Sequence, residues 1–308
     1  MRKMAKYSSI LFILLGTVSS LWAGTRLSPD ESQYLAVWGA VGGKTLLNNS
    51  KEVKPGLGVE PSLGVGYQYI RNGFMVQIGL EGSFSYLNNS LDNMDFRIKM
   101  KDTEGDPFVM HASVADCKDV VRTADVRIPI LVGYEYNRFY FLAGAKVGVS
   151  LWGTTQTKSQ LSTKGEYDRF IDWFENVPNH DFANNQTIKS SAYKLKFKAP
   201  SVDLHIEVGG RLDKIFPIHE RTNDLRHDYR LYLAIFADYG VLNIHENVSE
   251  GDLLTYTVKD GESLRFTAIP AMVSEQMMNK KVNPLTIGIK FTFLWNLPMK
   301  QECVRCMD

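Results

Sequence analysis

The stretch with the clearest chemical potential is Asp203-x-His205-x-Glu207, which places two carboxylates and an imidazole at alternate positions. Alternate side chains of a strand project from the same face, so these three groups would lie together. Such a set could hold a metal ion or act as an acid and a base. It could equally be a hydrogen-bonded network, which we favour because no nucleophile motif such as Gly-x-Ser-x-Gly occurs. We therefore expect no catalytic residue, no bound metal and no cofactor.

The elements that must position these residues are strands with one apolar and one polar face. The clearest is Thr286–Trp295, where aliphatic and aromatic residues alternate with small and polar ones. Asn72-Gly73 is the strongest short hairpin signal in the chain. The pattern predicts eight strands, at about Gln33–Val41, Gly58–Tyr69, Phe74–Leu87, Thr123–Tyr136, Phe139–Gly153, Pro200–Leu212, Tyr229–Asn243 and Thr286–Trp295.

The lengths of the connections predict how these strands are arranged. Three long connections, Asn88–Arg122, Thr154–Lys198 and His245–Val282, are separated by shorter ones, so all three fall on one side. This is typical of a closed antiparallel transmembrane β-barrel, with long extracellular loops and short periplasmic turns. Two short hairpins are expected within the loops, above the membrane, and counting them in the barrel would give ten or twelve strands. They are Met94–Lys101 with Pro107–Val114, and Leu253–Lys259 with Ser263–Ile269.

The N-terminus has the features of a secretory signal peptide. Basic residues precede the short apolar run Ile10–Val18, and Leu21-Trp22-Ala23 forms a cleavage site. We predict a signal peptide over residues 1–23, an outer-membrane barrel over 24–297 and a periplasmic tail over 298–308. Removal of the signal takes away three basic residues and lowers the formal net charge from +1 to −2, which gives no indication of nucleic-acid binding.

The cysteines predict neither a disulfide framework nor a metal site. Their number is odd and their spacing is wide, since Cys117 lies far from Cys303 and Cys306. Cys303-Val-Arg-Cys306 is a Cys-x-x-Cys motif in the C-terminal tail, and no folded element is expected around it. We interpret it as part of a plain tail, or at most as a local disulfide.

Two features indicate that the apolar faces point outward into lipid. Aromatic residues such as Tyr134, Phe139 and Trp295 cluster near strand ends, as in membrane-interface girdles. The opposite faces combine glycine and serine with charges of both signs, which suits a narrow polar interior. A soluble lipocalin-type barrel is the alternative. The predicted lumen charge network comprises Glu60, Glu81, Arg127, Glu135, Lys146, Asp203, His205, Glu207, Arg211, Arg230, Asp238 and Lys290.

An eight-stranded barrel is just wide enough for its interior to be filled by side chains, so charges inside it must pair or be hydrated. The network is therefore predicted to be an ion-pair plug, with a gated ion path as the alternative. In the second long loop, Gly165–Asn176 has aromatic residues at helical spacing. We expect a short amphipathic helix that caps the barrel or contacts a partner through Tyr167, Phe170, Trp173 and Phe174.

The last strand carries Thr286-x-Gly288-x-x-Phe291-x-Phe293, which resembles the β-signal read by the barrel-assembly machinery, although the chain continues about fifteen residues past Phe293. The mature chain also resembles the porin-like, OmpA/OmpX-like outer-membrane barrels of the PorT-like group of Bacteroidota. That resemblance implies the outer membrane of a Gram-negative bacterium and a structural, surface-contact or secretion-linked role. Fold alone does not settle function.

Together these patterns predict a non-enzymatic surface or scaffold barrel whose long loops contact a surface protein or glycan, either alone or within an outer-membrane complex. A narrow porin-like channel through the charged lumen and a lipid-modifying enzyme that uses His205 are the alternatives. The expected partners are outer-membrane lipid and lipopolysaccharide, and the assembly machinery during biogenesis; no nucleic acid is expected.

Overall fold

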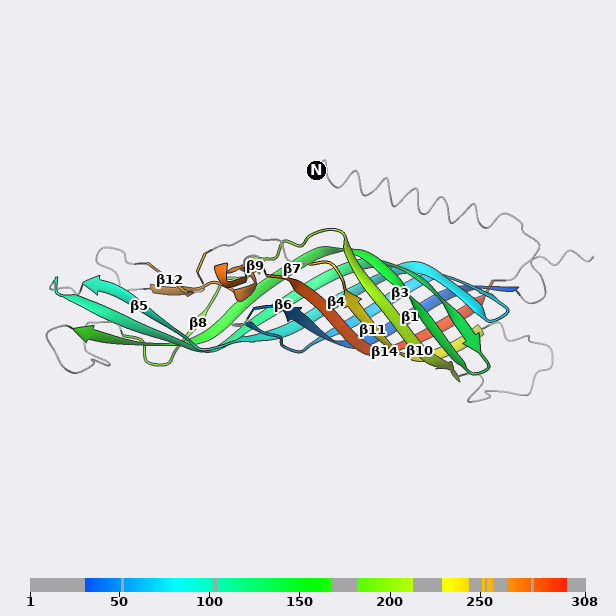
Figure 1. Cartoon of the computed structure of the whole chain (residues 1–308), viewed down its shortest axis with the longest axis horizontal. Helices are drawn as coiled ribbons and strands as arrows, with labels where there is room; N and C mark the ends of the chain where they lie inside the picture. The colour runs from blue at the N-terminus through cyan, green and yellow to red at the C-terminus, as the bar shows by residue number, and fades with distance from the viewer. Residues whose placement is uncertain are drawn as a thin grey trace, which may run out of the picture.

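A closed ring of eight antiparallel strands forms the barrel of the computed structural model. Figure 1 shows this barrel from the side, in the right half of the picture. The structure describes residues 31–50, 53–101, 105–167, 182–212, 229–243, 251–252, 254–257, 265–277 and 280–297. The ring closes where the last strand pairs with the first, as predicted. In order around the ring, its strands are β1 (Glu31–Asn48), β3 (Gly58–Arg71), β4 (Phe74–Leu91), β6 (Pro107–Tyr136), β7 (Phe139–Tyr167), β10 (Ser201–Arg211), β11 (Tyr229–Gly240) and β14 (Val282–Asn296).

The wall of the ring is apolar outside and polar inside. Leu63 is 73% exposed and Ile235 is 67% exposed, whereas Glu207 and Lys290 inside the ring are 1% and 3% exposed. This arrangement is the reverse of a lipocalin-type barrel, so the prediction of a transmembrane barrel is confirmed. Among the described residues, no helix has both the length and the apolar character needed to cross a membrane.

The short turn between β3 and β4 follows directly from its sequence. Asn72 and Gly73 both have positive φ angles, of 50° and 84°. A two-residue hairpin turn of this type needs positive φ at both positions, which asparagine tolerates and glycine adopts freely. The predicted tight turn is confirmed.

Two strands continue far beyond the ring and build an extension on one side (Figure 1, left). β6 has 30 residues and β7 has 29, although a tilted strand crosses the membrane with about 9–11. Within the predicted long connections Asn88–Arg122 and Thr154–Lys198, most of the described residues are strand, because β6 and β7 continue through them beyond the ends predicted for these strands. β5 (Met94–Lys101) pairs with β6, whereas β8 (Gln186–Lys189) and β9 (Tyr193–Lys194) pair with β7. The short strand β2 (Val53–Lys54) pairs with the end of β4.

The two hairpins expected above the membrane are both present, and neither adds a strand to the ring. One pairs β5 with the outer end of β6. The other pairs β12 (Leu254–Thr257) with β13 (Arg265–Ala268). Two short 3₁₀ helices, η1 (Ala271–Val273) and η2 (Glu275–Met277), follow β13. The barrel therefore keeps the predicted count of eight strands.

Each long strand carries one β-bulge against the other. Asp116 and Cys117 of β6 face the single residue Ser159 of β7, and Leu151 is the extra residue of β7 opposite the step from Ala124 to Asp125. A bulge shifts the alternation by one residue, so a face that pointed outward below it points inward above it.

Beyond the bulges the extension has an apolar core of its own. At its far end Phe108, Met110 and Tyr167 are buried together, with Phe182 and Phe266 packed against them. Nearer the barrel a second buried cluster joins β6, β7, β8 and the β12–β13 hairpin. The extension is therefore a packed structure rather than a set of loops.

The predicted amphipathic helix at Gly165–Asn176 is wrong over its first residues. Gly165–Tyr167 belongs to β7, and the Tyr167 ring is buried and stacked on Phe108 with 5.0 Å between ring centroids. Pairing with β6 decides the conformation here, because Tyr167 lies directly opposite Phe108. Other predicted features lie outside the described residues, namely Phe170, Trp173, Phe174, the signal peptide, the tail over residues 298–308, Cys303 and Cys306.

Candidate functional site

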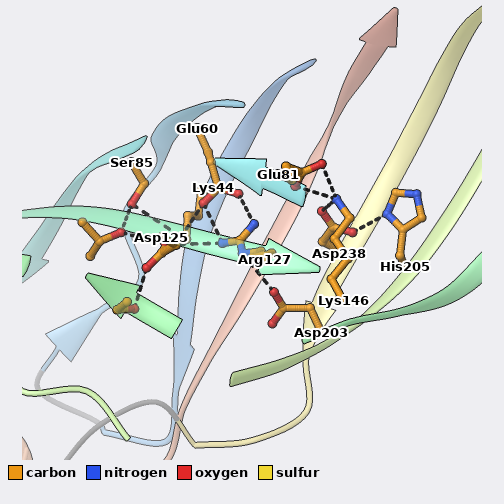
Figure 2. Close-up of polar contacts among 12 residues, drawn as sticks. Lys44, Glu60, Glu81, Ser85, Asp125, Arg127, Lys146, Asp203, His205 and Asp238 are labelled. Atoms are coloured by element: carbon orange, nitrogen blue, oxygen red, sulfur yellow. Dashed lines mark hydrogen bonds and ion pairs between the residues drawn. The ribbon is translucent and has the colours of Figure 1, made fainter. Parts of the chain in front are cut away.

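The lumen nearest the extension contains a cluster of charges built around Glu60 (Figure 2). Arg127 binds this carboxylate through two nitrogens, at 2.9 Å (Nη1 to Oε1) and 3.3 Å (Nη2 to Oε2), and Lys44 Nζ lies 2.5 Å from Oε2. Arg127 also lies 3.4 Å from Asp125 and 3.4 Å from Asp203. The planar guanidinium therefore joins three strands, since these acids come from β3, β6 and β10.

A second cluster lies deeper in the barrel around Lys146. Its Nζ is 3.0 Å from Glu81 and 2.9 Å from Asp238. The Trp38 indole N–H donates to Glu81 at 2.8 Å. That ring fits because Gly64 lies directly opposite, where a Cβ atom would stand 2.2 Å from the indole.

His205 is held between two carboxylates. Its Nδ1 is 2.5 Å from Asp238 and its Nε2 is 3.1 Å from Glu207. Both ring nitrogens of His205 are therefore engaged by carboxylate oxygens of the lumen. Glu207 also accepts from Lys290 at 2.7 Å and from the Tyr140 hydroxyl.

This geometry gives no support to a general-base role for His205, because the ring is buried and each nitrogen lies against a carboxylate of the network. No Ser, Thr or Cys of the described residues is hydrogen-bonded to it. Within the same described part of the chain, no group of three or more His, Cys, Asp or Glu side chains could hold a metal ion. The Asp203-x-His205-x-Glu207 stretch is thus used as part of a network, with Asp203 turned toward Arg127 instead of His205.

A third cluster lies at the end of the barrel that carries the short turns. Glu135 accepts from Arg211 at 2.8 Å, from Arg230 at 3.2 Å and from the Tyr232 hydroxyl at 2.6 Å. The Tyr232 ring packs against Tyr140 at a centroid distance of 4.8 Å.

Apolar side chains fill the lumen between these charged clusters. Leu131 and Leu294 are fully buried at 0% exposure, and Met75 is 1% exposed. They belong to one cluster with Trp38 and Tyr232. The interior is therefore filled by side chains rather than by a continuous polar path.

The structure places all twelve predicted lumen residues inside the ring and pairs each of them with at least one other charge. Sequence reasoning missed Lys44, because the predicted first strand stopped at Val41. The signal was present, since Trp38, Ala40 and Lys44 continue one alternating face. It also missed the aromatic members Trp38, Tyr140 and Tyr232.

The predicted assembly signal lies in β14, between β1 and β11. Thr286 faces the lumen, whereas Phe291 is 43% exposed on the outer wall. Phe293 stacks on Tyr229 with 5.9 Å between centroids, and Gly288 lies opposite Gly42. Its reading by the assembly machinery stays a prediction.

Comparison with known proteins adds two distant structural similarities. No family model matches the chain, and no curated protein does. Ail of Yersinia pestis, solved with the heparin analogue sucrose octasulfate, is similar at 8% identity and a TM-score of 0.23, over 85% of this chain and 99% of Ail. The translocator domain of the autotransporter NalP from Neisseria meningitidis is similar at 6% identity and a TM-score of 0.18, over 94% and 97% of the two chains. At these scores the fold assignment stands on the strand pairing alone.

Proposed function

We propose that this protein is a non-conducting barrel of the Gram-negative outer membrane that presents its extension as a binding surface for a cell-surface protein or glycan. The observation that carries the proposal is the extension itself. β6 and β7 continue well past the membrane-crossing length and enclose a core of their own. A barrel that served only as an anchor would not need them.

The filled lumen supports a binding role over a channel. The charges that would line an ion path are engaged with one another, and buried side chains such as Leu131, Leu142 and Leu294 close the space between them. Ions would have to break these pairs to pass. We expect no channel events when the purified protein is added to planar bilayers, and steady unitary currents would contradict the proposal.

The lumen also gives no support to a lipid-modifying enzyme. Lipid reaches the outer wall, whereas His205 is 1% exposed inside the ring and is engaged at both nitrogens. An unchanged lipid A profile after deletion of the gene is the expected result.

The decisive experiment removes the outer part of the extension, which β5 and the outer ends of β6 and β7 form, while keeping the ring. Residues 92–116 and 161–186 are each replaced by Asn-Gly, which joins Leu91 to Cys117 and Gln160 to Thr187 at positions where the strands already lie side by side. The truncated barrel and the wild type, both in nanodiscs, are applied to a glycan array and cross-linked to surface proteins of intact cells.

We expect the truncated barrel to fold, judged by heat-modifiable migration, and to lose the wild-type glycan or protein contacts. A control variant replaces the turn Asn137-Arg138 at the opposite end by Asn-Gly and should keep them. Contacts that survive the truncation would show that the removed outer ends of β5, β6 and β7 are not the binding surface.

A further inference from the structure

A row of lysines crosses the outer face of the strands where the ring meets the extension. Each member lies directly opposite the next across neighbouring strands, with one serine among them. All five side chains are exposed. From β2 through β4, β6, β7 and β8, the row is Lys54, Ser90, Lys118, Lys158 and Lys189.

The row has few acids to balance it. Lys54 pairs with Asp92 at one end. In the part of the chain that the structure describes, Lys118, Lys158 and Lys189 make no ion pair. Side chains directly opposite each other on a sheet are close neighbours, and like charges there are destabilising. Three adjacent lysines therefore weaken the sheet unless an anion lies over them.

A second set of cations lies between this row and the apolar wall. Arg122 and Lys194 lie on either side of Thr154 in another cross-strand row, and Arg122 lies over the Tyr86 ring at 5.5 Å. The next row toward the membrane contains the exposed, stacked rings of Phe84 and Trp152. These rings mark the aromatic edge of the lipid-facing wall.

The height of the lysine row above that edge follows from strand geometry. Lys118 is six residues along β6 from Ala124, which lies opposite Trp152. Six residues of a tilted strand rise by about 15 Å. Arg122 and Lys194 thus lie about 5 Å above that edge and the lysine row about 15 Å above it, so the cations face sideways from the wall, above the chains of the lipids that contact it.

We propose that this lateral basic face, formed by Lys54, Lys118, Lys158, Lys189, Arg122 and Lys194, binds the phosphate groups of phosphorylated glycolipid in the outer leaflet. Charge complementarity supports the assignment, because phosphates are matched by several lysines held at neighbouring positions. The position of the face supports the assignment as well, because the outward side of the same strands is apolar on the membrane side of the cations, where lipid chains lie. A surface hollow at one end of the row is lined by Lys54, Ser90 and Lys118, and the acids Asp92 and Asp116 line it as well.

The first test measures binding of bis-phosphorylated lipid A to the full-length protein in zwitterionic detergent, against the same lipid after removal of its phosphates. The wild type should bind the phosphorylated form more tightly. Replacement of Lys118, Lys158 and Lys189 by glutamine should remove that preference, by roughly fivefold for each lysine and about a hundredfold for all three.

A matched control removes three exposed cations from the far end of the extension, through Arg97→Gln, Lys99→Gln and Lys101→Gln on β5. The control should bind like the wild type. Equal binding by the triple lysine variant and the wild type would overturn the proposal, and so would an equal loss in the control. Inositol hexakisphosphate that binds more tightly than lipid A would assign the face to a soluble polyanion instead.

A single substitution separates binding from stability. Lys158→Glu places an acid between Lys118 and Lys189, so it converts two repulsive neighbours into two attractive ones. In neutral detergent its melting temperature should rise, while its affinity for phosphorylated lipid A should fall. A variant with a lower melting temperature and unchanged affinity would show that Lys158 serves the fold alone.

Discussion

Two arginines of the same strand, Arg127 and Arg122 of β6, are used in opposite ways. Arg127 points into the barrel, is 5% exposed and binds the buried Glu60 through two nitrogens. Arg122 points outward, is exposed and contacts the Tyr86 ring. Every described lysine and arginine of the lumen lies against a carboxylate, whereas most lysines of the outer row lie directly opposite another lysine. The charges inside the barrel thus stabilise it by pairing with one another, whereas the cations on its outer face are exposed to lipid headgroups and solvent.

The largest expected effect comes from removing Arg127, the central cation of the buried network. Arg127→Leu leaves the Glu60, Asp125 and Asp203 carboxylates with less compensation in a buried site. Removing one partner of a buried ion pair destabilises a protein by about 3–5 kcal/mol. We expect a loss of that size in the free energy of unfolding, measured with urea in detergent. Arg122→Leu is the control and should change it by less than about 1 kcal/mol; similar losses in the two variants would contradict the comparison.

A smaller effect tests steric packing on the two faces. A Cβ atom at Gly64 would stand 2.2 Å from the Trp38 indole, whereas one at Gly82 would meet nothing within 4 Å. Overpacking typically costs about 1–3 kcal/mol. Gly64→Val should therefore lower the melting temperature clearly and change the tryptophan fluorescence. Gly82→Val should leave both nearly unchanged, and the reverse order would show that the indole is not fixed over Gly64.

The smallest effect concerns Asp119, a buried acid of the extension that has no cation beside it among the described residues. It accepts hydrogen bonds from the hydroxyls of Thr155 at 2.6 Å and Thr157 at 3.2 Å, and from the Met272 N–H at 3.3 Å. Burial raises the pKa of the Asp119 carboxyl above its ordinary value, even though these hydrogen bonds act in the other direction. The folded state therefore holds a proton that the unfolded chain releases near pH 4.

The sign of the pH dependence follows from that difference. The stability contributed by Asp119 is present in acid, and it is lost as the pH rises from about 4 through the raised pKa. Asp119→Asn should remove this dependence. Hydrogen exchange at the Met272 amide, compared between the two proteins at each pH, measures it. Parallel pH profiles would show that the carboxyl does not titrate in this range.

The barrel could be predicted from sequence because each of its strands has lipid on one face and the polar lumen on the other. Alternation of Ile287, Ile289 and Phe291 with polar residues reports lipid on one side and a polar lumen on the other. Lys44 was missed through a boundary set too early, since its alternation was intact. The location of the charges was therefore predictable, whereas their partners depend on register between strands distant in sequence, as for Arg127 and Asp203.

The extension could not be predicted in the same way. Its strands are interrupted by the bulges at Asp116 and Leu151, which break the alternation that identifies a long strand. Tyr167 looked helical because its spacing to later aromatic residues is helical, yet its partner is Phe108, about 60 residues earlier. Spacing within a short window does not report such a distant partner.

The bulge at Asp116 lies where β6 passes from the lipid-facing barrel wall into the extension. Apart from Asp116, Lys118 and Arg122 near the bulge, the even-numbered residues of β6 are mostly apolar on both sides of it, from Ile130 and Ile128 in the wall to Met110 and Phe108 at the far end. In the barrel wall these apolar residues face lipid. Beyond the bulge, residues of the same numbering face the buried core of the extension. The phase shift produced by one extra residue lets a single alternating pattern face lipid in the barrel wall and the packed interior of the extension beyond it.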